Sequence, residues 1–208
     1  MSAEQRPQEF QFDLSGGHLA LDFANSVSRR DSPQRTVEHL RNYRDLVAFA
    51  RQTGILSQDQ AEGLEWRAFT NSRAGLRALR TAVGLREAIY RVFHALANGK
   101  PASAPDVRRI DKAVHAVLHR RHIAGEDGSY RWQWDANLDL QRVIWPVIES
   151  AAQLLTSPEV KRVRQCQASD CYWLFLDTSR NHSRRWCSME ACGNREKARR
   201  HYHRQRST

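Results

Sequence analysis

Apolar residues recur three and four positions apart through most of the first 160 residues. This spacing gathers them on one face of an α-helix, so it predicts a mainly helical N-terminal region. Ser57 and Ser103 begin sequences that resemble capping boxes, and Gly54 marks a helix end. Pro146 is expected to kink or break the last helix, because proline lacks a backbone N–H. The helices are expected at residues 37–52, 58–70, 73–97, 104–120 and 138–155.

Alternation of apolar and polar residues, which is typical of β-strands, is confined to short stretches. Residues 10–12 alternate, and residues 130–134 alternate after a glycine-containing turn, which predicts a hairpin with residues 122–124. Near the C-terminus, residues 172–176 resemble a strand and residues 184–186 its returning partner. The expected fold class is therefore α+β, mainly α with a small β component.

Positive charge is concentrated at the C-terminal end of the chain. The formal net charge is +10, and residues 161–208 hold twelve Lys and Arg against four Asp and Glu. Residues 1–160 hold twenty-one Lys and Arg against nineteen Asp and Glu, so they are nearly neutral. Such a high density of positive charge in a short segment favours binding to a polyanion over a merely solvated surface.

The apolar content is that of a globular protein. Hydrophobic residues make up 40% of the 208 residues, which is enough for a core of ordinary size. No stretch approaches the length of a membrane span, and the first residues lack the apolar run of a signal peptide. We therefore expect a soluble, cytoplasmic protein that does not interact with a membrane.

All four cysteines fall near the C-terminus, in the pattern C-x4-C-x15-C-x4-C: Cys166, Cys171, Cys187 and Cys192. Two equal, short-spaced pairs match the four thiolates that a tetrahedral zinc ion takes. Two disulfides or four unrelated thiols are the alternatives, and a reducing compartment disfavours the disulfides. A segment of fewer than fifty residues is also too small for a stable core of its own, and the binding of one Zn2+ per chain would supply the missing folding free energy.

A C-terminal helix should begin near Ser188 or Glu190 and place Cys192 in its first turn, where the helix dipole favours a thiolate. A helical wheel divides it into two faces. The face expected to pack against the hairpin holds Ala191, Arg195, Ala198 and Tyr202. The opposite face is expected to be free and basic, with Gly193 allowing a partner's backbone to approach. With cations from the preceding loop, the expected nucleic-acid contacts are Arg180, Arg184, Arg185, Lys197, Arg200 and Arg204.

The sequence Cys192-Gly193-Asn194-Arg195 resembles the signature of the bacterial CGNR zinc fingers, as does the surrounding stretch from residue 175 to residue 202. The resemblance implies a treble-clef-like, DNA-binding finger with the four cysteines as ligands. The sequence GGHLALDFANSV, residues 16–27, is similar to the opening motif of the ABATE domain, which is expected to belong to a stress-induced transcription regulator. We therefore expect an ABATE-like sensor or regulatory domain at 1–158 and the finger at 159–208.

Arg195 shares its face with apolar residues, so we expect it to be partly buried and to need an acidic partner. Asp177 is the nearest candidate in the predicted hairpin, which gives both residues a structural role in the finger. Asn194 points elsewhere, and contact with a base and capping of a turn stay open.

The N-terminal region contains few candidates for chemistry. It has no phosphate-binding loop, nucleophile elbow or His-Glu-x-x-His motif, so we expect no enzyme activity. Asp22 and Asn25 are expected to mark a helix start or to form buried hydrogen bonds rather than to contact a ligand. Three histidines are spaced so that one helix could present them all to a metal ion: His115, His119 and His122. A plain polar helix surface is the favoured interpretation. The tryptophans are expected in the core, with the lining of a small-molecule pocket as the alternative: Trp66, Trp132, Trp134 and Trp145.

The function that fits these features is a zinc-dependent, DNA-binding transcription regulator. Its N-terminal domain would sense a signal, through a small-molecule ligand, or mediate homo-oligomerisation. The main alternative is an RNA-binding zinc protein, since basic fingers of this kind serve both nucleic acids. An enzyme with a structural zinc tail, or a zinc tail that acts only in protein assembly, is less favoured.

Overall fold

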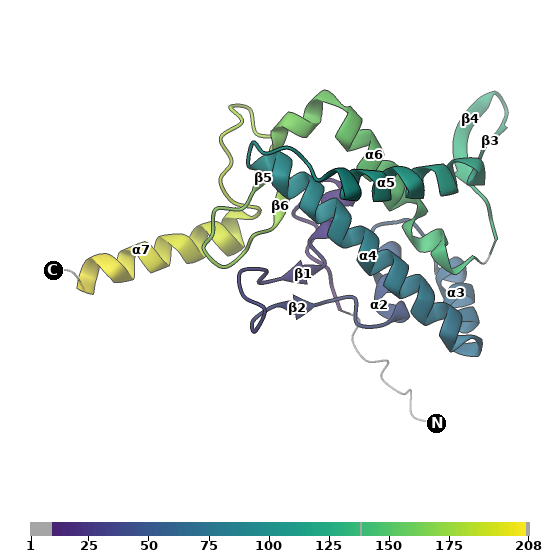
Figure 1. The fold of residues 1–208 in the computed structure, drawn as a ribbon, viewed down its shortest axis with the longest axis horizontal. Helices are drawn as coiled ribbons and strands as arrows, with labels where there is room; N and C mark the ends of the chain where they lie inside the picture. The colour runs from purple at the N-terminus through teal and green to yellow at the C-terminus, as the bar shows by residue number, and fades with distance from the viewer. Residues whose placement is uncertain (1–9, 138, 207–208) are drawn as a thin grey trace.

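The computed structural model describes residues 10–137 and 139–206. It is mainly helical, with small two-stranded antiparallel sheets, so the predicted fold class is confirmed (Figure 1). The α-helices are α1 (Leu19–Ala24), α2 (Tyr43–Gln52), α3 (Gln58–Thr70), α4 (Ser72–Ala97), α5 (Ala104–Val117), α6 (Trp145–Thr156) and α7 (Asn194–Arg206). The paired strands are β1 (Val27–Ser28) with β2 (Val37–Glu38), β3 (Arg121–Glu126) with β4 (Ser129–Trp134), and β5 (Val163–Gln165) with β6 (Leu174–Leu176).

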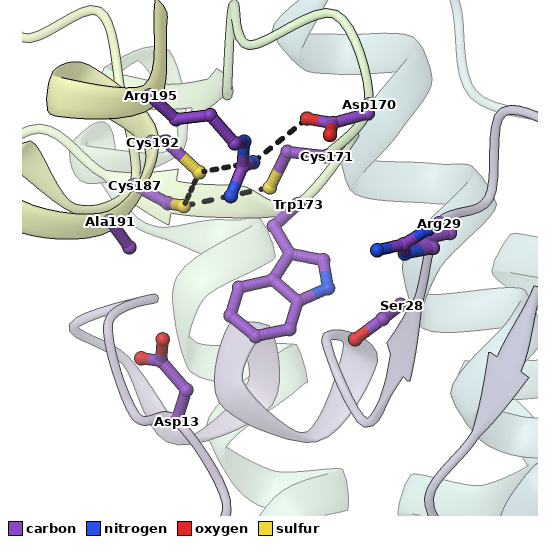
Figure 2. A pocket seen from close by; sticks show the side chains of 10 residues that line it. All are labelled: Asp13, Ser28, Arg29, Asp170, Cys171, Trp173, Cys187, Ala191, Cys192 and Arg195. Carbon is purple, nitrogen blue, oxygen red and sulfur yellow. Dashed lines mark hydrogen bonds and ion pairs between the residues drawn. The ribbon is translucent and has the colours of Figure 1, made fainter. Parts of the chain in front are cut away.

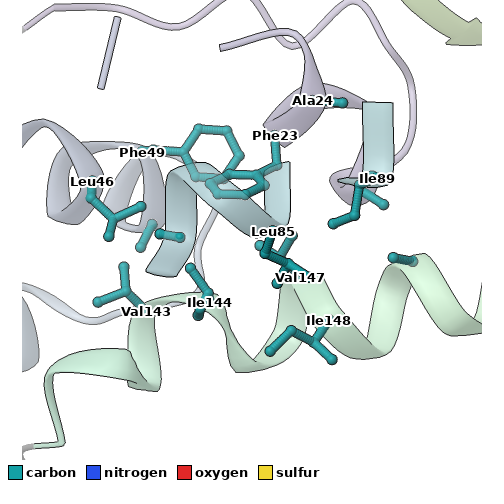
Figure 3. Close-up of a cluster of buried hydrophobic side chains, with 14 of the residues drawn as sticks. Phe23, Ala24, Leu46, Phe49, Leu85, Ile89, Val143, Ile144, Val147 and Ile148 are labelled. Atoms are coloured by element: carbon teal, nitrogen blue, oxygen red, sulfur yellow. The ribbon is translucent and has the colours of Figure 1, made fainter. Parts of the chain in front are cut away.

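Helix α4 runs through the middle of the molecule and contacts α1, α2, α3, α5 and both strands of the β5–β6 hairpin. Its buried side chains, such as Leu85 and Ile89, meet Phe23 of α1, Phe49 of α2 and Val147 of α6 in one apolar core (Figure 3). Helix α6 is almost wholly apolar on its inner side, which explains why it packs against both α1 and α5. The core therefore depends on segments from most of the chain length.

Capping residues set the helix boundaries that the sequence predicted well. Ser57 caps α3 with a capping box completed by Gln60, and Asn71 caps α4. The capping box expected at Ser103 was wrong, because its side chain makes no capping hydrogen bond, although α5 still begins at Ala104. Pro146 lies in the first turn of α6, so it marks a helix start rather than a kink. Residues 140–144 form a 3₁₀ helix, and the predicted start at Leu138 lies outside the described residues.

Two local predictions were wrong, and one helix was not predicted. The first helix begins at Tyr43 instead of residue 37, because Asn42 and Asp45 form its capping box and the residues before them include β2. Residues 10–12 form no strand. The short helix α1 was not predicted, since its residues are buried on nearly every side and show no helical alternation of apolar and polar positions.

The tryptophans divide between core and surface. Trp145 is buried and packs near Trp134, with ring centroids 5.9 Å apart. Trp66 on α3 and Trp132 on β4 are exposed, so the expectation that they lie in the core was wrong. The β3–β4 hairpin that carries Trp132 was predicted and extends from the body (Figure 1).

The β5–β6 hairpin lies between two hydrophobic clusters. Leu174 and Leu176 of β6 enter the large core, together with Val163 of β5. Phe175 points to the other face, where it packs with the four cysteines in a smaller cluster. Because neighbouring side chains of a strand point to opposite faces, this one hairpin joins the cysteine cluster to the main body.

The partner predicted for the 172–176 strand was wrong. Strand β6 pairs with β5, which precedes it, whereas residues 184–186 form no strand. The backbone of Arg185 instead accepts a hydrogen bond from Gln167 at 2.9 Å. In the described part of the chain, no helix is both long enough and apolar enough to cross a membrane.

Candidate metal centre

The four cysteines meet at the base of α7. Cys166 follows β5, and Cys171 lies in the turn before β6. Cys187 precedes the π-helical turn Met189–Gly193, and Cys192 lies within that turn. All four side chains are buried, and their Sγ atoms lie within 4.8 Å of one another. The Sγ atom of Cys187 is 3.6 Å from those of Cys171 and Cys192. Four thiolates at about 2.3 Å from a zinc ion lie roughly 3.8 Å apart, so the cluster fits one zinc ion per chain.

Local backbone geometry holds the cysteines in place. The N–H of Cys166 donates to the carbonyl of Trp173 at 2.7 Å, and that of Cys192 donates to Ser188 at 3.1 Å. Ser188 also caps the π-helical turn, because its hydroxyl accepts from the N–H of Ala191. The predicted helix start near Ser188 is thus confirmed, and it places Cys192 where the helix dipole favours a thiolate.

The thiols of the cluster differ in how readily they ionise. Hydrogen bonds with Cys166, together with burial, raise the pKa of Cys171 and of Cys187. Hydrogen bonds from the neighbouring thiols lower the pKa of Cys166. Arg195 donates to the Sγ atom of Cys192 at 3.4 Å, which adds a fixed positive charge beside that sulfur. When bound, a zinc ion would keep all four thiols deprotonated. The cluster is therefore built for a cation rather than for disulfides.

Arg195 has a different partner from the one that the sequence suggested. It forms an ion pair with Asp170 at 2.8 Å, and its side chain is 43% exposed rather than buried. Asp177 is fully buried and accepts hydrogen bonds from the Ser179 backbone and hydroxyl and from the Arg184 backbone. Burial alone would raise the pKa of Asp177, but these hydrogen bonds outweigh it and lower the pKa. Asp177 thus shapes the loop that follows β6.

The predicted packing face of α7 was also wrong. Ala191, Ala198 and Tyr202, which were expected to pack, are exposed, whereas Gly193 is buried. A Cβ atom on Gly193 would lie 2.5 Å from the Sδ atom of Met189, so this glycine permits internal packing and not the approach of a partner. The π-helical turn before α7 shifts the phase of the helix, and α7 then extends away from the body, so few residues pack (Figure 1).

The residues of α7 that face the finger are polar. Glu196 accepts hydrogen bonds from the backbone and hydroxyl of Ser169, and Arg199 pairs with Glu196 at 2.9 Å and with Asp170 at 3.7 Å. These contacts join the first turns of α7 to the loop between Cys166 and Cys171. Spacing along the chain does not predict these contacts, because the partners lie more than twenty residues apart.

The cations expected to bind nucleic acid differ in their surroundings. Arg184 is engaged inside the finger: it donates to the carbonyls of Ser15, Trp186 and Cys187 and lies 4.6 Å over the Phe175 ring. These bonds occupy its Nε and Nη2 atoms and favour a role in positioning, while its predicted phosphate contact stays a prediction. The others are exposed: Arg180, Arg185, Lys197, Arg200 and Arg204.

Two family models match the chain. The ABATE model, described as "Putative stress-induced transcription regulator", matches residues 17–158, and the CGNR zinc finger model matches residues 162–205. The chain belongs to the ABATE family. A comparison with curated proteins found no match. The boundary predicted between 158 and 159 stays a prediction, because the finger's hairpin shares the core of the ABATE segment.

The opening motif of the ABATE segment forms hydrogen bonds with the CGNR finger. The side-chain amide of Asn25 donates to the carbonyl of Leu174 at 2.8 Å and accepts from its N–H at 2.9 Å. The Trp173 indole N–H donates to the carbonyl of Val27 at 2.8 Å. At the other end of β6, the N–H of Leu176 donates to the carbonyl of Gly16 at 2.8 Å. The motif thus continues the edge of the finger's hairpin.

Asp22 of the ABATE segment orients Gly16 for this contact. Its carboxylate accepts from the N–H of Gly16 at 2.8 Å, and burial raises its pKa to about 7. A Cβ atom on Gly16 would lie 2.7 Å from that carboxylate, so glycine is required there. The buried hydrogen-bonding role expected for Asp22 and Asn25 is observed in both.

The three histidines of the ABATE segment do not converge. Helix α5 ends at Val117, so only His115 lies on it, while His119 lies in a 3₁₀ turn and His122 in β3. His115 and His122 each lie near a different carboxylate, Asp111 and Asp135. Among the described residues, the cysteine cluster is the group with metal-binding geometry, and the histidines are not part of it.

Proposed function

We propose that the chain is a zinc-dependent transcription regulator whose CGNR finger binds DNA through its phosphates. The observation that carries the proposal is α7, a helix that starts at the zinc-binding cluster and extends from the body with exposed cations (Figure 1). The exposed cations of α7 and two exposed arginines of the preceding loops form what we call the finger's cationic surface: Arg180, Arg185, Lys197, Arg200 and Arg204. Phosphate contacts of this kind supply most of the affinity of DNA-binding proteins.

Zinc would act structurally in this function. Bound to the four thiolates, it supplies folding free energy to the small cluster that carries α7. Arg184 and Arg195 would position the helix rather than contact DNA, since the one bonds to carbonyls within the finger and the other to Asp170 and Cys192. Asn194 is exposed in the first turn of α7, which suits it to approach a base.

The ABATE segment would sense a signal or mediate oligomerisation rather than catalyse a reaction. The hydrogen bonds from Asn25 and Gly16 to β6 support this view, because they offer a direct route from the segment to the finger. A regulator of this kind would work in the cytoplasm, where reducing conditions keep the four thiols available to zinc.

RNA binding is the second candidate. Tyr202 on α7 is 52% exposed, and Arg206 lies 4.8 Å over its ring. Exposed aromatic rings beside arginines can stack on unpaired bases, as single-stranded RNA requires.

Competition between nucleic acids would test the proposal. The zinc-loaded full chain is incubated with labelled duplex DNA and with a single-stranded RNA of matching sequence, and the nucleic acid recovered with the protein from cells is sequenced. We expect the duplex to bind more tightly and DNA to dominate the recovered material. Recovery of RNA would favour the second candidate, and recovery of neither would refute both.

A further inference from the structure

A cleft lies where the ABATE segment meets the CGNR finger. It has a volume of about 210 Å³, smaller than pockets for drug-sized ligands. One wall comes from the end of β1 and the loop before α1, and the other from the finger beside the cysteine cluster (Figure 2). Its lining includes Asp13, Ser28, Arg29, Trp173, Ala191 and Arg195. Asp170 and three cysteines of the cluster complete it on the finger side: Cys171, Cys187 and Cys192.

Arg29 brings an uncompensated positive charge to this cleft. Its side chain lies at the rim next to Ser28 and Trp173 (Figure 2), and among the described residues its guanidinium has no hydrogen bond or ion pair. The arginines nearby are different: Arg30 pairs with Glu87 at 2.8 Å, and Arg35 pairs with Asp31. Arg195 on the finger side is already neutralised by Asp170. Arg29 is therefore the cation that a ligand can use.

The backbone of Arg29 is strained. Its φ angle is 55°, in the left-handed region that glycine adopts without cost and that other residues adopt rarely. Strain of this type clusters at sites where a side chain must be held for a ligand. Glycine at this position would relieve the backbone strain, so arginine is present despite a cost in stability.

The remaining walls restrict the chemistry of a ligand. The Trp173 indole offers a flat apolar surface, held in place because its N–H donates to Val27. The methyl group of Ala191 lies nearby on the finger side. The carboxylate of Asp13 lies at the opposite end of the cleft from Arg29 (Figure 2), and Cys171, Cys187 and Cys192 line the finger side. Asp13 and the thiolates around a zinc ion would both repel a second anionic group.

We propose that this cleft binds a small monocarboxylic acid with a planar apolar body. Its carboxylate would pair with the guanidinium of Arg29, and its body would lie against the Trp173 indole. Because the walls belong to both segments, such a ligand would tie the end of β1 to the finger. The proposal concerns a ligand site and does not depend on whether the finger binds DNA.

Benzoate is a suitable probe, with benzamide as its neutral counterpart. Binding to the zinc-loaded full chain is measured by calorimetry for the wild type, Arg29→Gly and Arg35→Ala. Arg29→Gly removes the guanidinium and also relieves the left-handed strain, so its melting temperature should equal or exceed that of the wild type. Arg35→Ala removes the same charge from the same loop, away from the cleft.

We expect benzoate to bind the wild type and Arg35→Ala equally. Arg29→Gly should weaken benzoate binding between about ten- and a hundredfold, the cost of a lost charged hydrogen bond. Benzamide should bind the wild type about tenfold more weakly than benzoate, or worse. Failure of benzoate to bind the wild type, or equal binding to Arg29→Gly, would overturn the proposal. So would equal binding of benzamide, or a result in which Arg29→Gly changes only the affinity for DNA.

Discussion

Replacing Asn25 with alanine should loosen the CGNR finger from the ABATE segment. The Asn25 side chain makes two hydrogen bonds with the backbone of Leu174, at 2.8 and 2.9 Å. Both residues are buried, so water cannot replace the lost amide. Alanine therefore leaves one N–H and one carbonyl of β6 without a partner at the junction of the two segments.

The expected cost follows from these two groups. Each buried polar group without a partner costs about 1–3 kcal/mol, so the substitution should cost roughly 2–6 kcal/mol. The free energy of unfolding of a native protein is only about 5–15 kcal/mol, so this loss is a large share of the total stability. At about 2–4 °C per kcal/mol for a chain of this length, the melting temperature should fall by on the order of 10 °C.

Thermal unfolding of the zinc-loaded chain, followed by circular dichroism, would measure this fall. Asn181→Ala provides a control in the exposed loop after β6 and should leave the melting temperature unchanged. Asn71→Ala removes the N-cap of α4, where the side chain accepts from Ala74, and should cost about 1 kcal/mol. An Asn25→Ala chain as stable as the Asn181→Ala chain would refute the role of Asn25 in holding the finger.

Three further predictions concern the metal centre and its attachment. Cobalt bound to the wild type should show strong thiolate charge-transfer bands, and Cys171→Ser should lose them; weak bands in the wild type would refute four-thiolate binding. Arg195→Ala should speed zinc transfer to a chelator, because it removes the hydrogen bond to Cys192; an unchanged rate would show that the bond does not protect the site. The pKa of Asp22 is raised from 3.8 to about 7 in the fold, so its stabilising effect is complete below pH 3.8 and is lost as the pH rises through 7. Asp22→Asn cannot ionise, so its stability relative to the wild type should increase between pH 4 and pH 8 in denaturant titrations, and a difference independent of pH would contradict the shift.

Features that depend on neighbouring residues could be predicted from the sequence. The cysteine spacing indicated a zinc site because each pair needs only a short turn, and Ser188 marked the start of the helical segment that carries Cys192. The boundaries of α3 follow from the local hydrogen bonds between Ser57 and Gln60. In each of these cases the interacting groups lie a few residues apart.

Features set by tertiary contacts could not be predicted in this way. Asn25 and Leu174 are 149 residues apart, and nothing in the spacing of either residue pairs them. Arg195 was matched to Asp177 because both lie near the finger, but the turn between Cys166 and Cys171 brings Asp170 closer. A helical wheel also assumes one continuous α-helix, and the π-helical turn Met189–Gly193 breaks that assumption ahead of α7.

The salt dependence of DNA affinity tests the central claim, that α7 binds phosphates from a zinc-fixed base. Binding constants of the full chain for duplex DNA are measured at several salt concentrations for the wild type, Lys197→Ala and Arg200→Ala, with Arg73→Ala at the far end of α4 as the control. If each finger cation contacts one phosphate, each finger variant should reduce the log–log slope by about 0.9, with zinc content and the control unchanged. A wild-type slope in both finger variants, or no DNA binding by the zinc-loaded chain, would contradict the account.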